Sequence, residues 1–141
     1  MLQDLLAGLL AAVAYGVIGV AMMALGYVLV DLATPGKLRD LIWVHRNPNA
    51  ALLLVSGLLG VGIILTTAIA ASANDLIAGL IGTLAYGILG LVLMSLSFLL
   101  IDAVTPGKLG DELASPNIHP ATWVSATAHV VIAVIIAAAI W

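Results

Sequence analysis

The sequence contains no cysteine, and it is poor in charge: only 8% of its 141 residues are Asp, Glu, Lys or Arg. The absence of cysteine excludes disulfides, thiolate metal sites and a cysteine nucleophile. Because a soluble domain carries about 25% charged residues, this chain has too little polar surface to face water on all sides. Lysine and arginine together number only four, so there is no basic cluster of the kind that binds nucleic acid. Lipid is therefore the expected solvent.

Long uncharged runs account for most of the sequence, which is 64% hydrophobic. They cover residues 5–30, 50–73, 76–101 and 121–141. A helix that crosses a bilayer needs about 20 such residues, and lipid offers no partner for unpaired backbone groups, so each run predicts a transmembrane helix. The first run lacks the basic flank of a signal peptide and is too long for its apolar region. The predicted fold class is all-α, a membrane bundle of four transmembrane helices.

Two copies of one motif end the first and third runs: Asp-Leu-Ala-Thr-Pro-Gly-Lys from Asp31 and Asp-Ala-Val-Thr-Pro-Gly-Lys from Asp102. Shifting the sequence by 71 positions superimposes them, and 19 of the 37 residues in 4–40 are then identical to their partners. Such a match indicates an internal repeat. We predict two tandem two-helix membrane repeats, residues 1–71 and 72–141, arranged as parallel αα-hairpins about a pseudo-two-fold axis along the membrane normal.

The repeated motif predicts a structural turn after each of these helices. Proline disfavours the helical conformation in the residue before it and cannot donate to the helix ladder. Pro-Gly also fits the central positions of a type II turn, where glycine takes a positive φ. The turns comprise Thr34, Pro35, Gly36 and Lys37 in the first copy and Thr105, Pro106, Gly107 and Lys108 in the second. Residues 37–43 then form an amphipathic segment, and Asn49 is the expected N-cap of the next helix.

All lysine and arginine residues lie in the two loops that carry the Thr-Pro-Gly-Lys motif. They are Lys37, Arg39, Arg46 and Lys108. Since short cytoplasmic loops are enriched in positive charge, we predict that both loops are cytoplasmic and that both termini lie outside.

Glycines recur at helical spacing on one face of the first and third runs. The expected packing residues are Gly16, Gly19 and Tyr15 in the first run and Gly87, Gly90 and Tyr86 in the third. Small residues three or four positions apart let two membrane helices approach closely. We therefore expect these faces to pack against each other or against neighbouring subunits, with the tyrosines donating interhelical hydrogen bonds. A pore lined by glycine backbone is the alternative.

The duplicated Tyr-Gly-x-x-Gly helix that ends in Asp-x-x-Thr-Pro-Gly-Lys-Leu resembles the YjfL-like family of small bacterial inner-membrane proteins. The resemblance covers the whole chain and implies a multi-pass protein of the bacterial plasma (inner) membrane, built from a tandem two-helix repeat. It implies no activity, because the function of that family is unknown, and it brings no catalytic residues.

Asp31 and Asp102 are the first candidates for chemistry, because each lies in the last turn of a predicted spanning helix. A carboxylate at that position faces the negative end of the helix dipole, which costs about 0.3–1 kcal/mol when exposed. One interpretation is structural: each carboxylate anchors its turn, with Lys37 or Lys108 as the local cation. The other interpretation is a site for a cation or a shared proton.

His129 lies near the middle of the fourth run, where an ionisable side chain is a functional candidate. At helical spacing it shares a face with small and hydroxyl-bearing residues, among them Thr122 and Ser125, so it is expected to face protein rather than lipid. It is either a neutral histidine with one interhelical hydrogen bond or the titratable group of an ion or proton pathway.

Motifs for catalysis, cofactors and metals are absent from the sequence. There is no nucleophile elbow, phosphate-binding loop or paired-histidine motif, and the loop residues His45 and His119 are not spaced as metal ligands. We therefore expect no enzymatic activity, no cofactor and no metal site.

Two functions are compatible with these features. In the first, several copies form a channel or a cation or proton pathway that uses Asp31, Asp102 and His129; a homo-oligomer is expected because four helices alone enclose little space. In the second, the chain is a non-catalytic accessory subunit of a larger membrane complex. The expected partners are the lipid bilayer and either further copies or other membrane proteins, and not nucleic acid.

Overall fold

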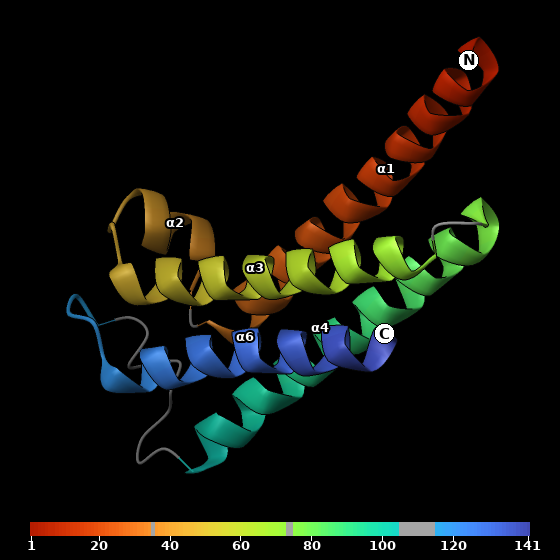
Figure 1. Ribbon diagram of the computed structural model, residues 1–141. Coiled ribbons are helices and arrows are strands. Elements are labelled where there is room, and N and C mark those ends of the chain that lie inside the picture. Colours follow the sequence, from red (N-terminus) through yellow and green to blue (C-terminus); the bar gives the residue numbers. More distant parts are fainter. Residues whose placement is uncertain (35, 73–74, 105–114) are drawn as a thin grey trace.

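The computed structural model describes residues 1–34, 36–72, 75–104 and 115–141, and every regular element in these ranges is a helix. The helices are α1 (Leu2–Ala33), α2 (Leu38–Trp43), α3 (Pro48–Ala71), α4 (Leu76–Val104) and α6 (Pro120–Ile140) (Figure 1). Four of them, α1, α3, α4 and α6, are long and apolar enough to cross a membrane. The all-α class and the four transmembrane helices predicted from the hydrophobic runs are confirmed.

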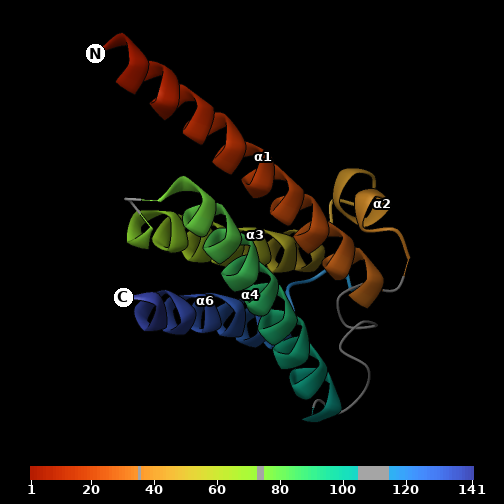
Figure 2. The same cartoon turned by 90° about the vertical axis from the view of Figure 1, so that its right-hand side faces the viewer.

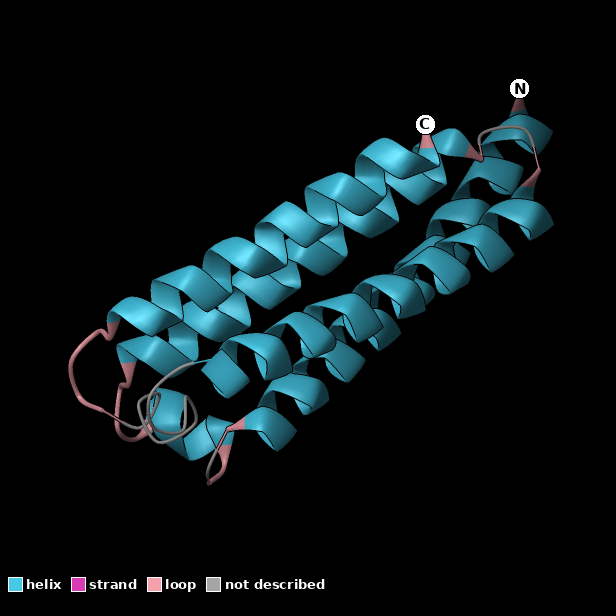
Figure 3. Ribbon diagram, turned by 90° about the horizontal axis from the view of Figure 1, so that it is seen from below, coloured by secondary structure: helices cyan, strands magenta, loops and turns pink. Residues whose placement is uncertain are grey.

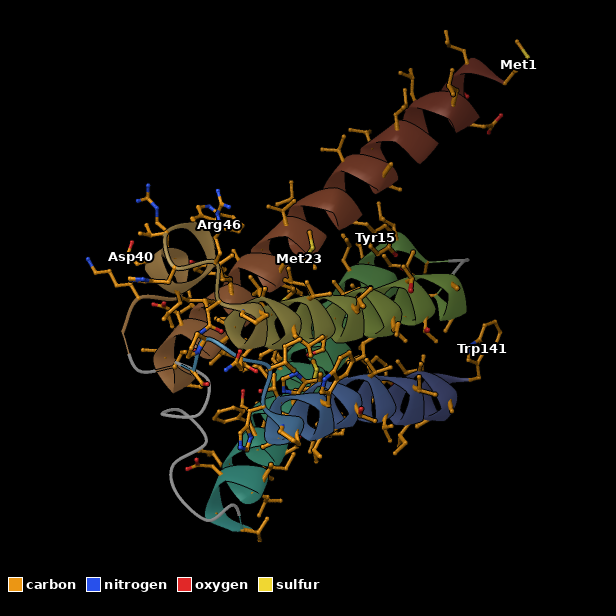
Figure 4. All side chains as sticks on the ribbon, turned by 90° about the vertical axis from the view of Figure 1, so that its left-hand side faces the viewer. Met1, Tyr15, Met23, Asp40, Arg46 and Trp141 are labelled. Atoms are coloured by element: carbon orange, nitrogen blue, oxygen red, sulfur yellow. The ribbon has the colours of Figure 1, made fainter. Side chains whose placement is uncertain are left out.

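The long helices alternate in direction: α1 and α4 run one way, and α3 and α6 run the other way (Figure 2). Both chain termini therefore lie at one end of the bundle, together with the end of α3 and the start of α4 (Figure 3). Helix α2 and the starts of α3 and α6 lie at the other end, which we call the loop end. Asp40 and Arg46 lie there, opposite Met1 and Trp141 (Figure 4).

Helix α3 is the central element: it packs against each of the other long helices, and more extensively than α4, which also contacts all three. One cluster of buried side chains joins all four: Met22, Val61, Ile64, Leu65, Leu91, Met94, Ala133 and Ile136. A second cluster pairs Leu53 of α3 with Phe98 of α4. Because lipid chains are as apolar as these residues, the clusters stabilise the bundle through close packing rather than through exclusion of water.

Helix α1 contributes least to this core. Only 6% of the residues in its 18-residue apolar segment are buried, compared with 39% in the corresponding segment of α3 and 28% in those of α4 and α6. The N-terminal part of α1 diverges from the other helices (Figure 2). A two-fold axis would exchange the α1–α3 hairpin with the α4–α6 hairpin. The packing of α4 on α3 would then be matched by an equivalent packing of α1 on α6. Among the described residues, α1 has no comparable packing against α6. The pseudo-two-fold axis, like the two-repeat division of the chain, stays a prediction.

The start of α3 differs from the prediction. Asn47, and not Asn49, is the N-cap: its side-chain oxygen accepts hydrogen bonds from the N–H groups of Asn49 and Ala50 at 2.9 and 3.1 Å. Pro48 then occupies the first turn, where its missing N–H costs nothing. The prediction of Asn49 was wrong because Asn-Pro-Asn offers two possible caps, and the proline fits the helix better inside it than before it.

The predicted glycine face has different surroundings on the two helices. Gly87 and Gly90 of α4 are buried, and a Cβ placed on Gly87 would lie 2.6 Å from the Cε of Met22. On α1, no atom lies within 4 Å of a Cβ placed on Gly16 or Gly19. Within one chain, Gly87 of α4 therefore lies close to a neighbouring helix, whereas Gly16 and Gly19 of α1 do not.

Candidate functional site

The turn after α1 is held by residues of the repeated motif. Thr34 Oγ1 donates a hydrogen bond to the carbonyl of Val30 at 2.5 Å. Gly36 has a φ of +94°, a conformation that residues with a Cβ adopt only with strain. Asp31 Oδ1 accepts from the N–H of Leu38 at 2.6 Å. The carboxylate thereby fastens the first turn of α2 to the end of α1.

This geometry gives Asp31 a structural task. Among the described residues it forms no ion pair with Lys37, which is exposed; the backbone N–H of Leu38 is its partner. Asp102 lies in the last turn of α4 and is partly buried. The motif residues outside the described ranges are Pro35, Thr105, Pro106, Gly107 and Lys108.

Asn49 joins the start of α3 to the segment that precedes α6. Its side chain is fully buried, and its Nδ2 donates to the carbonyls of Ser115 and Asn117 at 3.0 and 2.7 Å. Its Oδ1 accepts from the N–H of His119 at 2.8 Å and from Thr122 Oγ1 at 2.9 Å. An amide has two donor hydrogens and two acceptor lone pairs, so every hydrogen-bonding position of this side chain is used.

Thr122 begins a line of polar side chains along α6, at the interface with α3. Thr122, Ser125 and His129 follow one another at spacings of three and four residues and are all buried, so they lie on one helix face. Asn49 and Ser56 meet them from α3. Ser125 Oγ has no hydrogen-bond partner in the described part of the chain. We call these residues the polar row: Asn49, Thr122, Ser125, Ser56 and His129.

His129 is hydrogen-bonded to Ser56 across the helix interface, with 3.1 Å between Nδ1 and Oγ. The same hydroxyl lies 2.8 Å from the carbonyl of Leu53, and it has one hydrogen to donate. If that hydrogen goes to Leu53, Nδ1 is protonated and donates to Ser56, which leaves Nε2 as an acceptor. If it goes to Nδ1, Nε2 carries the proton. Moving the serine hydrogen between its two acceptors therefore exchanges the tautomer of a buried imidazole.

The imidazole also lines a cavity of about 240 Å³ whose other walls come from α1, α3 and α4. Apart from His129 and Ser95, its lining residues are apolar or glycine. An ordered water needs two to four polar partners, so the cavity suits apolar groups. Polar species find more hydrogen-bonding groups along the polar row.

The two predicted tyrosines differ in their surroundings. Tyr15 Oη lies 3.5 Å from Oγ of Ser72, the C-cap of α3, and also fills the space beside Gly79 of α4, so Tyr15 makes interhelical contacts. Tyr86 is 39% exposed. The tyrosines therefore do not play matched roles within one chain.

Within the described residues, the two loop histidines do not belong to a cluster of metal ligands. His119 caps α6, because its Nδ1 accepts from the N–H of Ala121 at 3.2 Å, and His45 is exposed. In the ranges that the structure describes, no three His, Cys, Asp or Glu side chains are grouped so that they could hold a metal ion.

The sequence did not single out Asn49 and Ser56 as site residues. They are seven residues apart, and two helical turns place them on one face of α3. That spacing was the available signal, but it could not show that α6 would lie against this face.

Comparisons with known proteins agree with a membrane-embedded chain. A family profile described as Domain of Unknown Function (DUF350) matches residues 4–140. A UPF0719 transmembrane protein of Mycolicibacterium paratuberculosis is 32% identical over 139 residues, which cover 99% of this chain and 92% of the relative. UPF0719 transmembrane proteins of Mycobacterium bovis and Mycobacterium tuberculosis are each 36% identical over 139 residues, which cover 99% of this chain and 91% of theirs. No solved structure matches the chain.

Proposed function

The chain belongs to the DUF350 family, a domain of unknown function, and on that premise we propose that several copies form a pathway for protons or small cations across the bacterial inner membrane. The observation that carries this proposal is the polar row, which leads from Asn49 at the loop end to the buried pair of Ser56 and His129. We also propose that the chain is related to the YjfL-like family that its repeated motif resembles. The relatives found by comparison carry a different name, UPF0719.

The composition of the polar row suits transfer of protons. Hydroxyl groups both donate and accept hydrogen bonds, and imidazole can take up a proton at one nitrogen while releasing one at the other. Ser125 stands one helical turn from both Thr122 and His129, and its hydroxyl, which has no partner among the described residues, can bond a species in transit. A buried ionisable side chain in a spanning helix is costly in lipid, which supports a functional reason for His129.

The structure shifts the emphasis among the three predicted candidates. Asp31 is engaged with the N–H of Leu38, which favours its anchoring task over a transport task. Asp102 is kept as a candidate for the entrance at the end of α4. His129 becomes the central candidate, because it combines burial, a hydrogen-bonded hydroxyl and a position in the row.

Proton flux into reconstituted vesicles tests the function. Vesicles with the wild-type chain should dissipate a pH gradient faster than empty vesicles, as reported by an internal pH-sensitive dye. His129→Gln should fold, because an amide can still hydrogen-bond with Ser56, but it should lose flux by about a hundredfold, the smaller end of what a positioned proton-transferring group contributes.

The matched control for this flux experiment is Thr66→Val. Thr66 is exposed on α3, and its hydroxyl bonds to carbonyls of its own helix, so its removal should leave flux unchanged. Wild-type vesicles that pass no ion under proton, sodium or potassium gradients would refute the transport function. Full flux in His129→Gln would refute the role of the histidine.

The second candidate function, an accessory subunit of a larger complex, is favoured by the largely unburied α1. Such a helix offers a surface for another protein as readily as for another copy. Purification in mild detergent distinguishes the two functions. A transport assembly should contain only further copies of this chain, whereas an accessory subunit should co-purify with unrelated chains in stoichiometric amount.

The orientation in the membrane is also a proposal. Arg46 lies at the loop end, opposite Met1 and Trp141 (Figure 4), and the positive-inside rule assigns that end to the cytoplasm. We expect alkaline phosphatase fused after Trp141 to be active, because this enzyme functions only outside the cytoplasm. An inactive phosphatase fusion together with a fluorescent cytoplasmic reporter at the same position would reverse the assignment.

A further inference from the structure

Matching faces of α1 and α4 differ in what covers them. The buried residues of α4 are Gly79, Thr83, Gly87, Gly90, Leu91, Met94 and Phe98. None of the residues 71 positions earlier is buried: Gly8, Ala12, Gly16, Gly19, Val20, Met23 and Tyr27. Leu91 is 5% exposed but Val20 is 63% exposed, and Met94 is 4% exposed but Met23 is 41% exposed. We call these seven residues of α1 the open face.

The glycines distinguish the open face from an ordinary lipid-facing surface. Lipid accounts for an exposed valine or methionine, because lipid chains are equally apolar. Glycine, however, costs a helix about 1 kcal/mol relative to alanine, and in membranes that cost is offset where another surface packs into the space that glycine leaves. No atom of the described residues lies within 4 Å of a Cβ placed on Gly8, Gly16 or Gly19, so this part of the chain does not fill that space.

On α4, the space beside the matching glycines is filled by two neighbouring helices. Gly87 packs against Met22 of α1 and Leu65 of α3, and Gly90 packs against Ile64 of α3. The small-residue face of α4 therefore lies in the groove between α1 and α3.

A second apolar groove lies between α4 and α6. Its volume is about 250 Å³, and its lining residues are Leu93, Leu96, Ser97, Leu100, Ile132, Ile135 and Ile136. Ser97 Oγ is shielded from solvent yet has no hydrogen-bond partner among the residues described. The groove thus has apolar walls and one unsatisfied hydroxyl.

The walls of the two grooves correspond in sequence position. Leu93 stands 71 residues after Met22, the spacing of the repeated motif. Pro48 and Pro120 open α3 and α6 in the same way, each behind a side-chain cap, and they are 72 residues apart. With that spacing, Leu65 corresponds to Ala137 of α6, which follows the groove-lining residue Ile136.

We infer that the open face of α1 in one copy lies in the α4–α6 groove of a second copy, as the buried face of α4 lies in the α1–α3 groove within each chain. Gly16 would then meet Leu93 and Ala137 of the neighbour. This contact rests on the proposed function in one respect, namely that several copies of the chain assemble. Because each copy presents α1 on one side and the groove on the other, the contact is heterologous and repeats from copy to copy until a ring closes.

Cysteine crosslinking tests the contact directly, because the natural sequence has no cysteine. Chains carrying Gly16→Cys and chains carrying Leu93→Cys, with different tags, are co-expressed and treated in the membrane with a short thiol-specific crosslinker. We expect a covalent dimer that carries both tags, and no dimer when either variant is expressed alone.

The control pairs Leu93→Cys with Val17→Cys. Val17 is 65% exposed, and its counterpart Ile88 on α4 stays 51% exposed, so the inferred contact leaves Val17 facing lipid and predicts little crosslinking. Dimers from Gly16→Cys alone, without any that contain Leu93→Cys, would show that α1 meets α1 and would overturn the inference. Equal yields from Gly16→Cys and Val17→Cys would also overturn it.

Failure of this contact and failure of the proposed function give different results. If the crosslinks form in membranes but reconstituted vesicles pass no ion, the contact is supported and the transport function is refuted. If vesicles show proton flux but Gly16→Cys and Leu93→Cys do not crosslink, the transport function is supported and the contact is refuted.

Discussion

Replacing Asn49 with alanine is expected to destabilise the chain by about 3 kcal/mol. The amide makes four hydrogen bonds, all in a fully buried position. Each buried group left without a partner costs about 1–3 kcal/mol. The carbonyl of Ser115 keeps a second donor, Asn47 Nδ2 at 3.0 Å, so the loss falls mainly on Asn117, His119 and Thr122. Thermal unfolding in detergent micelles, followed by circular dichroism, measures the change.

Asn117→Ala is the matched control for Asn49→Ala, because it removes the same kind of side chain from the segment that Asn49 contacts. Asn117 is exposed and contributes its backbone carbonyl to Asn49, so losing its side chain should change stability by less than about 0.5 kcal/mol. Equal unfolding temperatures for the two variants would mean that Asn49 does not hold the two hairpins together.

Gly87→Leu is expected to have the second large effect, a destabilisation of about 1–3 kcal/mol or more. A Cβ at this position would lie 2.6 Å from the Cε of Met22 and 2.9 Å from the Cδ2 of Leu65, and leucine adds three further carbon atoms. Met22 and Leu65 belong to the cluster that joins the four long helices. The substitution should therefore separate α4 from α1 and α3, and it should lower the midpoint of thermal unfolding in micelles.

Gly82→Leu makes the same chemical change on the same helix. No atom lies within 4 Å of a Cβ placed on Gly82, and leucine has the higher helix propensity, so this variant should be as stable as the wild type or slightly more stable. A Gly87→Leu variant that unfolds together with Gly82→Leu would contradict the packing of α4 described here.

The sequence was sufficient for the elements that depend on local chemistry. Long apolar runs that do not alternate with polar residues cross lipid as helices, which is why the four spans were predicted correctly. The Pro-Gly pair predicted a positive φ, and Gly36 has one. The short segment after the first turn is helical as α2. These features need no knowledge of which surfaces meet.

The features that the sequence could not supply depend on contacts between distant segments. Asn49 bonds to residues that follow it by 66 to 73 positions, so no local pattern could reveal its full set of partners. Helical spacing gave the face of His129, but the identity of Ser56 as its partner required the packing of α6 on α3. Gly16 and Gly87 have nearly the same local sequence yet different surroundings, because the helices that could cover them are arranged differently.

Water access to Ser125 tests most directly the central claim that the polar row is a route into the membrane. The variants Ser125→Cys and Val124→Cys place a thiol at neighbouring depths, but Ser125 is buried whereas Val124 is 57% exposed on the outer surface. A thiol reacts as the thiolate, which forms in contact with water. A membrane-impermeant cationic thiol reagent added from the loop end should therefore label the Ser125→Cys variant about tenfold faster than the Val124→Cys variant, since the thiolate fraction sets the rate. If Ser125→Cys is labelled no faster than Val124→Cys from either side of the membrane, a hydrated or ion-conducting route along the row is contradicted.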